Sequence, residues 1–270
     1  MDVVAFGEVL WDIIDGVPHI GGAPFNFAAH AVQCGLSSAL VSAVGSDELG
    51  ARALDAVKRL GVSTEAIAVH PSLPTGTVNV SLHDGIPTYE IVRPVAWDEI
   101  RGPIIKPPRA FYFGTLAQRS PISAGTLERF LDACAESLVF FDVNLRQDYW
   151  SRECVARGID RTNILKVNDD EMRILGFEPR HLFQEHPRLK IVIETRGAAG
   201  CAVWTQSGGF FTNPAQSSGP VVDTVGAGDS FSAAFLAAVL SGADPVVAAR
   251  EGNIRAGKVA AHAGAIPKDV

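Results

Sequence analysis

The sequence has few cysteines, and it lacks long apolar runs. No two of its four cysteines form a C-x-x-C pair, so the sequence has neither a short redox motif nor a zinc knuckle. The longest strongly apolar stretch, residues 233–240, is far shorter than the roughly 20 residues that cross a bilayer. The first residues, MDVVAFGEV, lack the basic region of a secretion signal. We therefore expect a cytoplasmic protein with free, buried thiols and no membrane partner.

The sequence also lacks an excess of positive charge. Lys and Arg number 23 and Asp and Glu 30, which leaves a formal net charge of −7. No basic run offers a footprint for a phosphate backbone, so we expect no nucleic-acid partner. Gly and Pro number 26 and 16 among 270 residues, too few for a low-complexity chain. With 47% hydrophobic residues, the chain can bury the core of a single domain over 1–270, with room for a small appendage.

Short apolar runs alternate with helical patterns along most of the chain. Each run is followed by a stretch of helical character or a glycine-rich turn, and continuous apolar runs suit strands that are covered on both faces. This alternation predicts an α/β fold with a doubly wound, mostly parallel sheet flanked by helices. The expected strands include 3–6, 39–45, 111–114, 138–143, 164–167 and 190–194, and the expected helices include 26–34, 48–61, 125–137 and one that ends near Gly242.

One region breaks the alternation. Residues 76–92 contain two runs of alternating polarity separated by Asp84-Gly85, a hairpin signal. Residues 13–20 could supply another strand or two to the same unit. We therefore expect a small β-sheet lid formed by about 13–20 and 73–94. Because so few residues bury little surface by themselves, its apolar face must rest on substrate, on the α/β body or on a second subunit, as in a homodimer through the lid.

The strongest chemical signal is DTVGAGDSF at 223–231, a glycine turn that opens into an apolar helix. Converging N–H groups and the positive end of a helix would make Gly226, Ala227 and Gly228 a hole for a phosphate or for the charge of phosphoryl transfer. Asp229 beside it is placed to accept the proton of an attacking hydroxyl. The alternative is a simple turn in which Asp229 caps the helix. The chain lacks G-x-x-x-x-G-K-[ST], so a P-loop enzyme is not expected.

A second glycine-rich segment, GGAPFNFAAHA at 21–31, would let a ligand lie against the backbone. Asn26 would point an amide at that ligand, and Asp12, just past the first strand, would lie at the same sheet edge, where open α/β folds bind ligands. A carboxylate and an amide facing one crevice suit a polyhydroxylated substrate. Asp12 as a surface turn residue and Asn26 as a cap remain the alternatives.

The sequence resembles the ribokinase-like, or PfkB-type, carbohydrate kinases, and within them most closely the bacterial fructokinases. The resemblance covers essentially the whole chain. It is carried, in order, by GEVLWD, GGAPFNFA, VGSDELG, PTGTV, FDVNLR, NDDE, ETRGAAG and DTVGAGDSF.

The resemblance implies a role for individual residues. It makes Asp229 the catalytic base beside the anion hole of Gly226, Ala227 and Gly228. The sugar-binding positions it implies are Asp12, Gly22 and Asn26, with Arg93 in the lid as a further candidate.

For the nucleotide and the metals, the resemblance implies a second set. Asn168 and Glu171 match an N-x-x-E motif that organises Mg²⁺, commonly through water, and the nucleotide phosphates; solvated helix-face residues are the alternative. Asp223 and Val225 match positions that hold a monovalent cation, K⁺ in many members. The remaining nucleotide candidates are Arg146 at the transferring phosphate, Thr195 and Gly197 in a turn lining the ATP site, and Asn253 in the penultimate helix, near the adenine.

These residues imply an ATP- and Mg²⁺-dependent kinase acting on a primary hydroxyl of a small sugar, with D-fructose at O6 as the first choice. Ribose, 2-keto-3-deoxygluconate or a nucleoside remain open as substrates, and so does a catalytically silent sugar- or nucleotide-binding regulator. Members commonly run longer, and FDVNLR replaces the more frequent FDPN form. The sugar pocket is where these departures would act.

Overall fold

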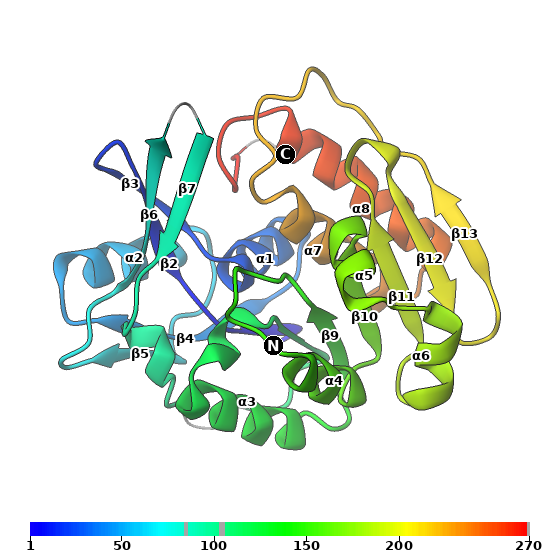
Figure 1. Ribbon diagram of the computed structural model, residues 1–270, viewed down its shortest axis with the longest axis horizontal. Coiled ribbons are helices and arrows are strands. Elements are labelled where there is room, and N and C mark those ends of the chain that lie inside the picture. Colours follow the sequence, from blue (N-terminus) through cyan, green and yellow to red (C-terminus); the bar gives the residue numbers. More distant parts are fainter. Residues whose placement is uncertain (84–85, 103–105, 269–270) are drawn as a thin grey trace.

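A large, mostly parallel sheet forms the centre of the protein. The computed structural model describes residues 1–83, 86–102 and 106–268, and only the backbone of 81–83 and 86–88. Within this part, nine strands follow the order β13-β12-β11-β10-β9-β8-β1-β4-β5 (Figure 1). Neighbouring strands from β11 to β5 are parallel, whereas β12 pairs antiparallel with β11, and β13 pairs antiparallel with β12. The strands are β1 (Val3–Phe6), β4 (Ser38–Gly45), β5 (Ile67–His70), β8 (Ala110–Phe113), β9 (Leu138–Asp142), β10 (Ile164–Asn168), β11 (Ile191–Thr195), β12 (Cys201–Thr205) and β13 (Phe210–Asn213).

Helices cover both faces of this sheet, which confirms the doubly wound α/β prediction. Buried side chains form two separate clusters, one under each helical layer. One layer consists of α1 (Ala23–Gln33), α2 (Glu48–Arg59), α7 (Ala227–Leu240) and α8 (Pro245–Ala260); the other consists of α3 (Pro121–Ala133), α4 (Arg152–Asp160), α5 (Asp169–Leu175) and α6 (Pro179–Glu185). Three short 3-10 segments, η1 (Ala96–Glu99), η2 (Leu116–Arg119) and η3 (Gly197–Ala199), lie in the connections.

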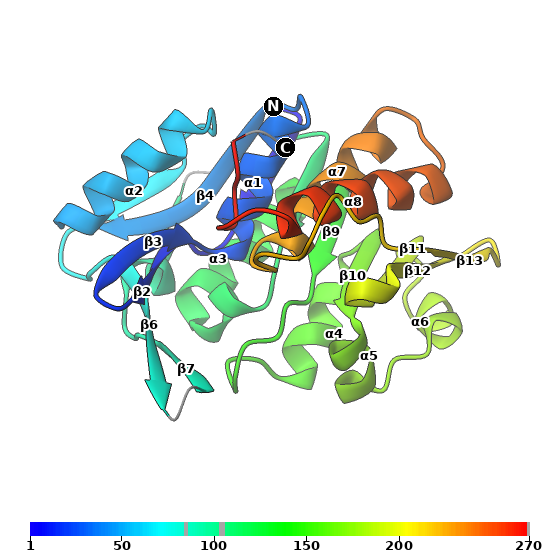
Figure 2. The ribbon, with the colours of Figure 1, turned by 90° about the horizontal axis from the view of Figure 1, so that it is seen from above.

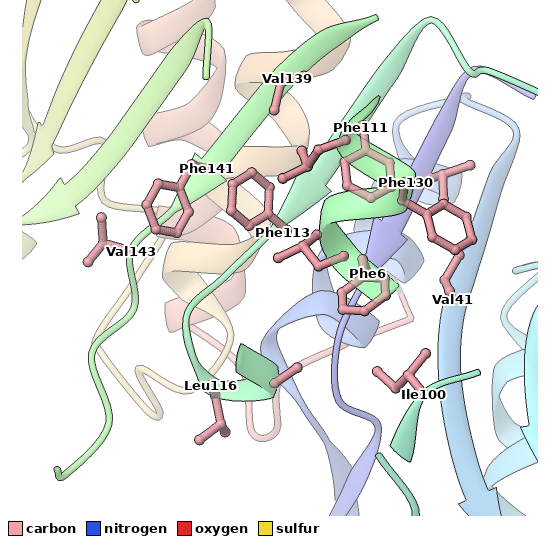
Figure 3. Close-up of a cluster of buried hydrophobic side chains, with 14 of the residues drawn as sticks. Phe6, Val41, Ile100, Phe111, Phe113, Leu116, Phe130, Val139, Phe141 and Val143 are labelled. Carbon is pink, nitrogen blue, oxygen red and sulfur yellow. The ribbon is translucent and has the colours of Figure 1, made fainter. Parts of the chain in front are cut away.

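Aromatic side chains fill both layers. On the α3 side, Phe113 and Phe141 stack from adjacent strands, with ring centroids 4.5 Å apart (Figure 3). On the α1 side, Phe27 stacks on Tyr112 at 3.7 Å. Each such buried ring contributes about 1.5–3 kcal/mol relative to exposure. Because β1 and β8 are buried along their whole length, their sequences read as continuous apolar runs and not as alternating ones.

A small separate sheet, expected from the sequence, follows the order β3-β2-β6-β7. It consists of β2 (Leu10–Ile14), β3 (Val17–Gly21), β6 (Gly76–His83) and β7 (Ile86–Ile91). Figure 2 shows β6 and β7 projecting away from the large sheet. The expected turn at Asp84-Gly85 lies outside the described residues. The small sheet begins three residues earlier than we expected, so Asp12 lies inside β2, paired with His19 and Val78.

Side chains of the body hold β7 at its backbone. Gln147 Nε2 donates to the carbonyl of Tyr89 at 2.6 Å, and Tyr149 Oη donates to that of Ile91 at 3.3 Å. Arg119, whose guanidinium lies 3.8 Å from the Trp97 ring centroid, donates to the carbonyl of Val92 at 2.8 Å. The small sheet is therefore fastened to the body along β7, and also at β2, where Trp11 Nε1 donates to the carbonyl of Leu49 at 3.0 Å.

The sequence analysis placed Asn253 in the penultimate helix, which is wrong. Asn253 lies in α8, and within the described residues no helix follows α8. The next residues form turns and bends, because Gly264 adopts a left-handed φ of 81° and Pro267 cannot donate to a helix. The antiparallel hairpin β12–β13 and the short α6 were not expected either.

Candidate active site

The first turn of α7 is open to a ligand. Gly226, the residue before it, has a left-handed φ of 77°, and a Cβ there would lie 2.5 Å from the carbonyl oxygen of Ala265. Glycine is therefore required for both conformation and space. No side chain caps this end of α7. Within the described chain, the backbone N–H groups of Gly228 and Asp229 have no partner. Two donors at the positive end of a helix can bind an anion.

Asp229 meets the beginning of α1. Asn26 Nδ2 donates to Asp229 Oδ2 at 2.9 Å, which joins residues 203 positions apart. The amide oxygen of Asn26 is buried and has no hydrogen-bond partner among the described residues. Such an orphaned acceptor is costly unless a ligand satisfies it. The predicted base and the predicted sugar-binding amide thus lie together, and the amide keeps one acceptor for a hydroxyl donor.

Gly22 and Glu8 build the start of α1. Gly22 has a φ of 113°, and a Cβ there would lie 2.5 Å from the carbonyl oxygen of Glu8. Glu8 Oε1 accepts from the N–H of Ala23 at 3.3 Å and so caps the helix from a distant segment. Burial raises the pKa of Glu8 to about 7. The sequence analysis quoted Glu8 within GEVLWD but did not recognise it as part of the site.

Burial also dominates the acidity of Asp229. It raises the pKa of this carboxyl to about 6, and the negative charge of Asp142 raises it further. The hydrogen bond from Asn26 and the positive charges of Lys166 and Arg146 act in the opposite direction. At neutral pH Asp229 is therefore ionised, yet it binds a proton more readily than an ordinary aspartate.

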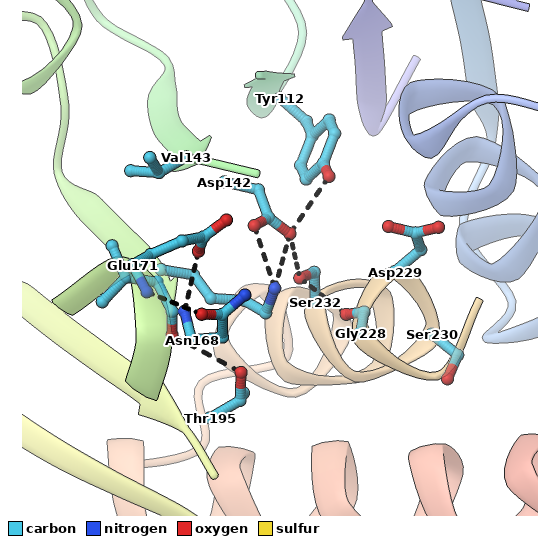
Figure 4. Close-up of polar contacts among 12 residues, drawn as sticks. Tyr112, Asp142, Val143, Asn168, Glu171, Thr195, Gly228, Asp229, Ser230 and Ser232 are labelled. Carbon is cyan, nitrogen blue, oxygen red and sulfur yellow. Dashed lines mark hydrogen bonds and ion pairs between the residues drawn. The ribbon is translucent and has the colours of Figure 1, made fainter. Parts of the chain in front are cut away.

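Behind Asp229 lies a buried ion pair that sequence reasoning missed. Lys166 Nζ donates to both carboxylate oxygens of Asp142, at 2.9 and 2.8 Å. Figure 4 shows Asp142 and Asp229 reaching toward the same space from β9 and α7, with Tyr112 and Ser232 bonded to Asp142. Lys166 stands two residues before Asn168, and Asp142 within FDVNLR, but nothing local in the sequence pairs them.

Arg146 is a cation that acts on Asp229, Glu8 and Asp12. Arg146 is exposed in the loop after β9, and its positive charge lowers the pKa of Glu8, Asp12 and Asp229. The same cation therefore acts on all three carboxyls. Asp12 is half-buried, and burial raises its pKa above the usual range. A partly dehydrated carboxylate of this kind is suited to accept from hydroxyl groups.

Asn168 and Glu171 form a capping box at the start of α5. Asn168 Oδ1 accepts from the N–H of Glu171 at 2.8 Å, and Glu171 Oε2 accepts from the N–H of Asn168 at 2.8 Å. Glu171 Oε1 also accepts from the N–H of Leu145 at 2.7 Å, beside Arg146. Glu171 is buried, so it is not the solvated helix-face residue of the alternative interpretation.

Thr195 and Gly197 lie at the next strand end. Thr195 pairs with Asn168 across β10 and β11, at the carboxyl edge of the parallel strands. Gly197 opens η3 with a left-handed φ of 52°. These two candidates therefore share an edge with the capping box, as a nucleotide site across neighbouring strands requires.

Two predicted residues make other contacts. Asn253 is buried, and its Nδ2 donates to the carbonyls of Asn213 and Pro214 at 3.1 Å, so it fixes the segment after β13. The guanidinium of Arg93 lies 5.5 Å from the Tyr149 ring centroid, at the end of β7. Neither residue is in contact with Asp229 or Asn26 in this structure.

Asp223 and Val225 are drawn together just before the anion hole. Asp223 Oδ1 accepts from the N–H of Val225 at 3.0 Å, and Oδ2 accepts from the N–H of Gly264 at 3.0 Å. The segment around Gly264 continues to Ala265, which packs on Gly226. The predicted cation site and the anion hole therefore share one wall.

Two features are absent from the part of the chain that the structure describes. In residues 1–83, 86–102 and 106–268, no group of three or more His, Cys, Asp or Glu side chains is arranged to hold a metal ion. In the same residues, no helix has the length and apolar character needed to cross a membrane.

Comparison with known proteins agrees with the fold. The pfkB family of carbohydrate kinases matches residues 4–269, and the chain belongs to this family. Among its relatives, the fructokinase of Solanum tuberosum is 28% identical over 269 residues, which cover 88% of this chain and 81% of that protein.

Solved structures share the architecture. An uncharacterised sugar kinase from Pyrococcus horikoshii, solved with ATP, has a TM-score of 0.84 at 25% identity, covering 98% of this chain and 94% of the other. A double mutant of the Vibrio cholerae fructokinase, solved with fructose, ADP and a potassium ion, has a TM-score of 0.84 at 22% identity with the same coverage. This last likeness concerns the fold alone.

Proposed function

We propose that this protein transfers the γ-phosphoryl group of ATP to a primary hydroxyl of a small sugar, and that D-fructose, phosphorylated at O6, is the substrate. The observation that carries the proposal is the meeting of Asp229 with Asn26 beside an open helix N-terminus. That arrangement combines a base, an unsatisfied buried acceptor for a sugar hydroxyl, and donors for a phosphate.

In the proposed reaction, the sugar hydroxyl oxygen attacks the γ-phosphorus. A new O–P bond forms while the bond from the γ-phosphorus to the bridging oxygen breaks, and its electron pair leaves with ADP. The proton of the hydroxyl passes to the Asp229 carboxylate. A pKa of about 6 suits this step, because the group is ionised near pH 7 and still binds the proton better than an exposed aspartate.

The backbone at Gly228 and Asp229 would hold the negative charge of the transferring group. Donors fixed by a helix are already oriented, so little reorganisation is needed when the charge develops. Arg146 supplies a positive charge near the same carboxyls. Positioning and charge stabilisation are the main sources of rate in phosphoryl transfer.

The residues near Asn168 and Glu171 fit a water-mediated Mg²⁺ site. Both oxygens of Glu171 already accept from backbone N–H groups, so the carboxylate is held in place and keeps lone pairs for water. When bound, Mg²⁺ would neutralise charge on the nucleotide phosphates. Asn168, Thr195 and Gly197 would line the nucleotide site.

Asp223 and Val225 fit a monovalent cation next to the anion hole. Asp223 is fixed by two backbone donors, and the remaining lone pairs of its carboxylate, together with backbone carbonyls, are the oxygen ligands that such an ion needs. We propose K⁺, the ion that the family resemblance implies for these two positions; the double mutant of the Vibrio cholerae fructokinase was solved with it. Assays in KCl, NaCl and choline chloride at one ionic strength test this assignment.

Fructose is favoured by the names of the relatives. Fructokinases of several plants align over 87–94% of this chain at 27–29% identity. Aminoimidazole riboside kinase and a ribokinase-type protein share the fold at 23% and 20% identity, so other furanose-like acceptors are the second choice.

A single assay distinguishes these candidate substrates and the silent regulator. Purified protein with Mg-ATP is tested for ADP release with fructose, ribose, 2-keto-3-deoxygluconate, nucleosides and glucose. We expect fructose to give the highest kcat/KM, and Asp229→Asn to abolish the signal. Turnover of another sugar alone would replace fructose. No turnover with any acceptor, while ATP and sugar still bind, would instead identify a silent regulator.

A further inference from the structure

The buried ion pair of Lys166 and Asp142 lies directly under the anion hole. The side chains are 7% and 3% exposed. A Cβ built on Gly228 would lie 3.5 Å from Lys166 Nζ, so the ammonium packs against the first turn of α7. Burying both charges costs several kcal/mol of desolvation, and such pairs rarely add stability over apolar residues. Their place under this turn calls for another explanation.

Asp142 also joins three elements. Besides Lys166 on β10, its Oδ2 accepts from Tyr112 Oη on β8 at 3.2 Å and from Ser232 Oγ on α7 at 3.0 Å. The Ser232 hydroxyl also lies 3.0 Å from the carbonyl oxygen of Gly228. A single buried carboxylate thus ties two strands of the sheet to the turn that carries Asp229.

We propose that Lys166 and Asp142 act as a positioning pair for Asp229, holding the first turn of α7 and setting the balance of charge that the base experiences. This rests on the proposed function only for the role of Asp229 as base. Neither residue touches substrate in the proposal, and both act through α7 and through their charges.

The surroundings of Asp229 show why opposite charges matter here. It is faced by Asn26 from α1, Glu8 after β1, Tyr112 from β8, Asp142 from β9, Arg146 from the following loop and Lys166 from β10. Two further carboxylates, Glu8 and Asp142, lie near Asp229, and Lys166 is the buried cation among these groups. Asp142 raises the pKa of Asp229 and Lys166 lowers it.

We therefore expect the pKa of Asp229 to shift in opposite directions when Asp142 and Lys166 are replaced one at a time. In Asp142→Asn the neighbouring negative charge is gone and Lys166 remains, so Asp229 should titrate about one pH unit lower, a tenfold weaker proton affinity. In Lys166→Met, Asp229 loses a positive charge that lowers its pKa, while the negative charge of Asp142 remains. Asp229 should then titrate about one pH unit higher.

Carboxyl ¹³C NMR of aspartate-labelled protein measures both shifts directly, with Asp229→Asn to assign the resonance. The pH dependence of kcat/KM is the second readout, where the acidic limb should move down in Asp142→Asn. Lys190→Met, at an exposed lysine before β11, is the matched control and should titrate as the wild type does.

Opposite shifts support the positioning pair. Equal titration of the base in both variants and the wild type would overturn it, and so would loss of stability without any shift. If Lys166→Met does not fold, Asp142→Asn alone decides, because it preserves the shape of the side chain. Since NMR needs no turnover, an inactive wild-type protein would count against the proposed function and not against the pair.

Discussion

Asp229 combines a raised pKa with a direct hydrogen bond from the side-chain amide of Asn26. Replacing it with asparagine keeps the size and the hydrogen bond to Asn26 but removes the proton acceptor. We expect kcat to fall by about 10²-fold or more while the Kd for ATP is unchanged, because general-base catalysis contributes that much. Steady-state kinetics and calorimetry measure the two quantities. Unchanged turnover would remove Asp229 as the base.

Ionised Asp229 should lower the free energy of unfolding at neutral pH. Its pKa is about 6 in the folded protein against 3.8 for the ordinary carboxyl. A raised carboxyl pKa means that folding favours the protonated form, so the stabilisation present at low pH is lost as the pH rises through 6. Asp229→Asn should therefore melt at a higher Tm than the wild type at pH 8, with the difference shrinking toward pH 4. A constant difference would contradict this.

Asp12 tests the sugar side of the site. Asp12→Ala removes a half-buried carboxylate that can accept from two adjacent hydroxyls, and each charge-assisted bond is worth about 1.5–3 kcal/mol. We expect sugar affinity to drop at least tenfold and ATP affinity to stay within about twofold. Calorimetric titration of each ligand measures this. Asp15→Ala, in the exposed turn between β2 and β3, is the control, and equal sugar affinity in Asp12→Ala would exclude Asp12 from the site.

At the scale of elements, α1 connects the sugar site to the C-terminal segment. Asn26, His30 and Gln33 follow one another along one face of this helix. His30 Nε2 donates to the carbonyl of Ala265 at 2.9 Å, and Gln33 Nε2 donates to that of Pro267 at 2.9 Å. Because Ala265 packs on Gly226, this face supports the wall of the anion hole from behind.

His30 makes that support sensitive to pH. Burial lowers the pKa of His30 to about 4 from 6.5, so folding favours the neutral ring. The contribution of the neutral His30 ring to the free energy of unfolding is fully present above pH 6.5. It is lost as the pH falls toward 4, by up to about 3 kcal/mol. Urea titrations between pH 6.5 and pH 4 measure this. As the pH falls, the free energy of unfolding should decrease more in the wild type than in a His30→Gln variant. Parallel curves for the two proteins would refute the assignment.

At the scale of the whole molecule, the small sheet is fastened to the body along β7, through Gln147, Tyr149 and Arg119. If it closes over the sugar as a lid, motion should be smallest at β7 and at Trp11 of β2, which donates to the carbonyl of Leu49, and largest at β3 and β6. We expect amide exchange in β3 and Thr77–His83 to slow when sugar binds, while β9 stays unchanged. Equal exchange with and without sugar, together with equal ATP hydrolysis, would exclude a closing lid.

The small sheet also presents apolar side chains to solvent. Ile14 and Val17, which flank the turn between β2 and β3, are 42% and 55% exposed. A homodimer through the small sheets would cover them, and light scattering should then give twice the 28.6 kDa of one chain. Ile14→Glu should yield the monomer, with Val246→Glu on the outer end of α8 as a control that stays dimeric. A monomeric wild type would exclude this assembly.

Much of the fold and the outline of the site follow from the sequence alone. Apolar runs that alternate with helical patterns specify a parallel sheet, since each buried strand needs cover on both faces. The glycine turn before Asp229 and the ordered motifs identify the family and locate the turn that carries the proposed base, because a left-handed glycine and a helix start are local properties of the chain. The edge hairpin β12–β13 escaped because its strands have no helix between them.

Only the tertiary structure decides which distant residues share the site. Lys166 meets Asp142 across 24 positions, Ser232 meets Asp142 across 90, and His30 meets Ala265 across 235. Sequence patterns report the local conformation of the chain, whereas these contacts depend on how strands are ordered in the sheet and how helices lie over it. The acidity of Asp229 depends on the same arrangement, because burial and neighbouring charge exist only once the chain has folded.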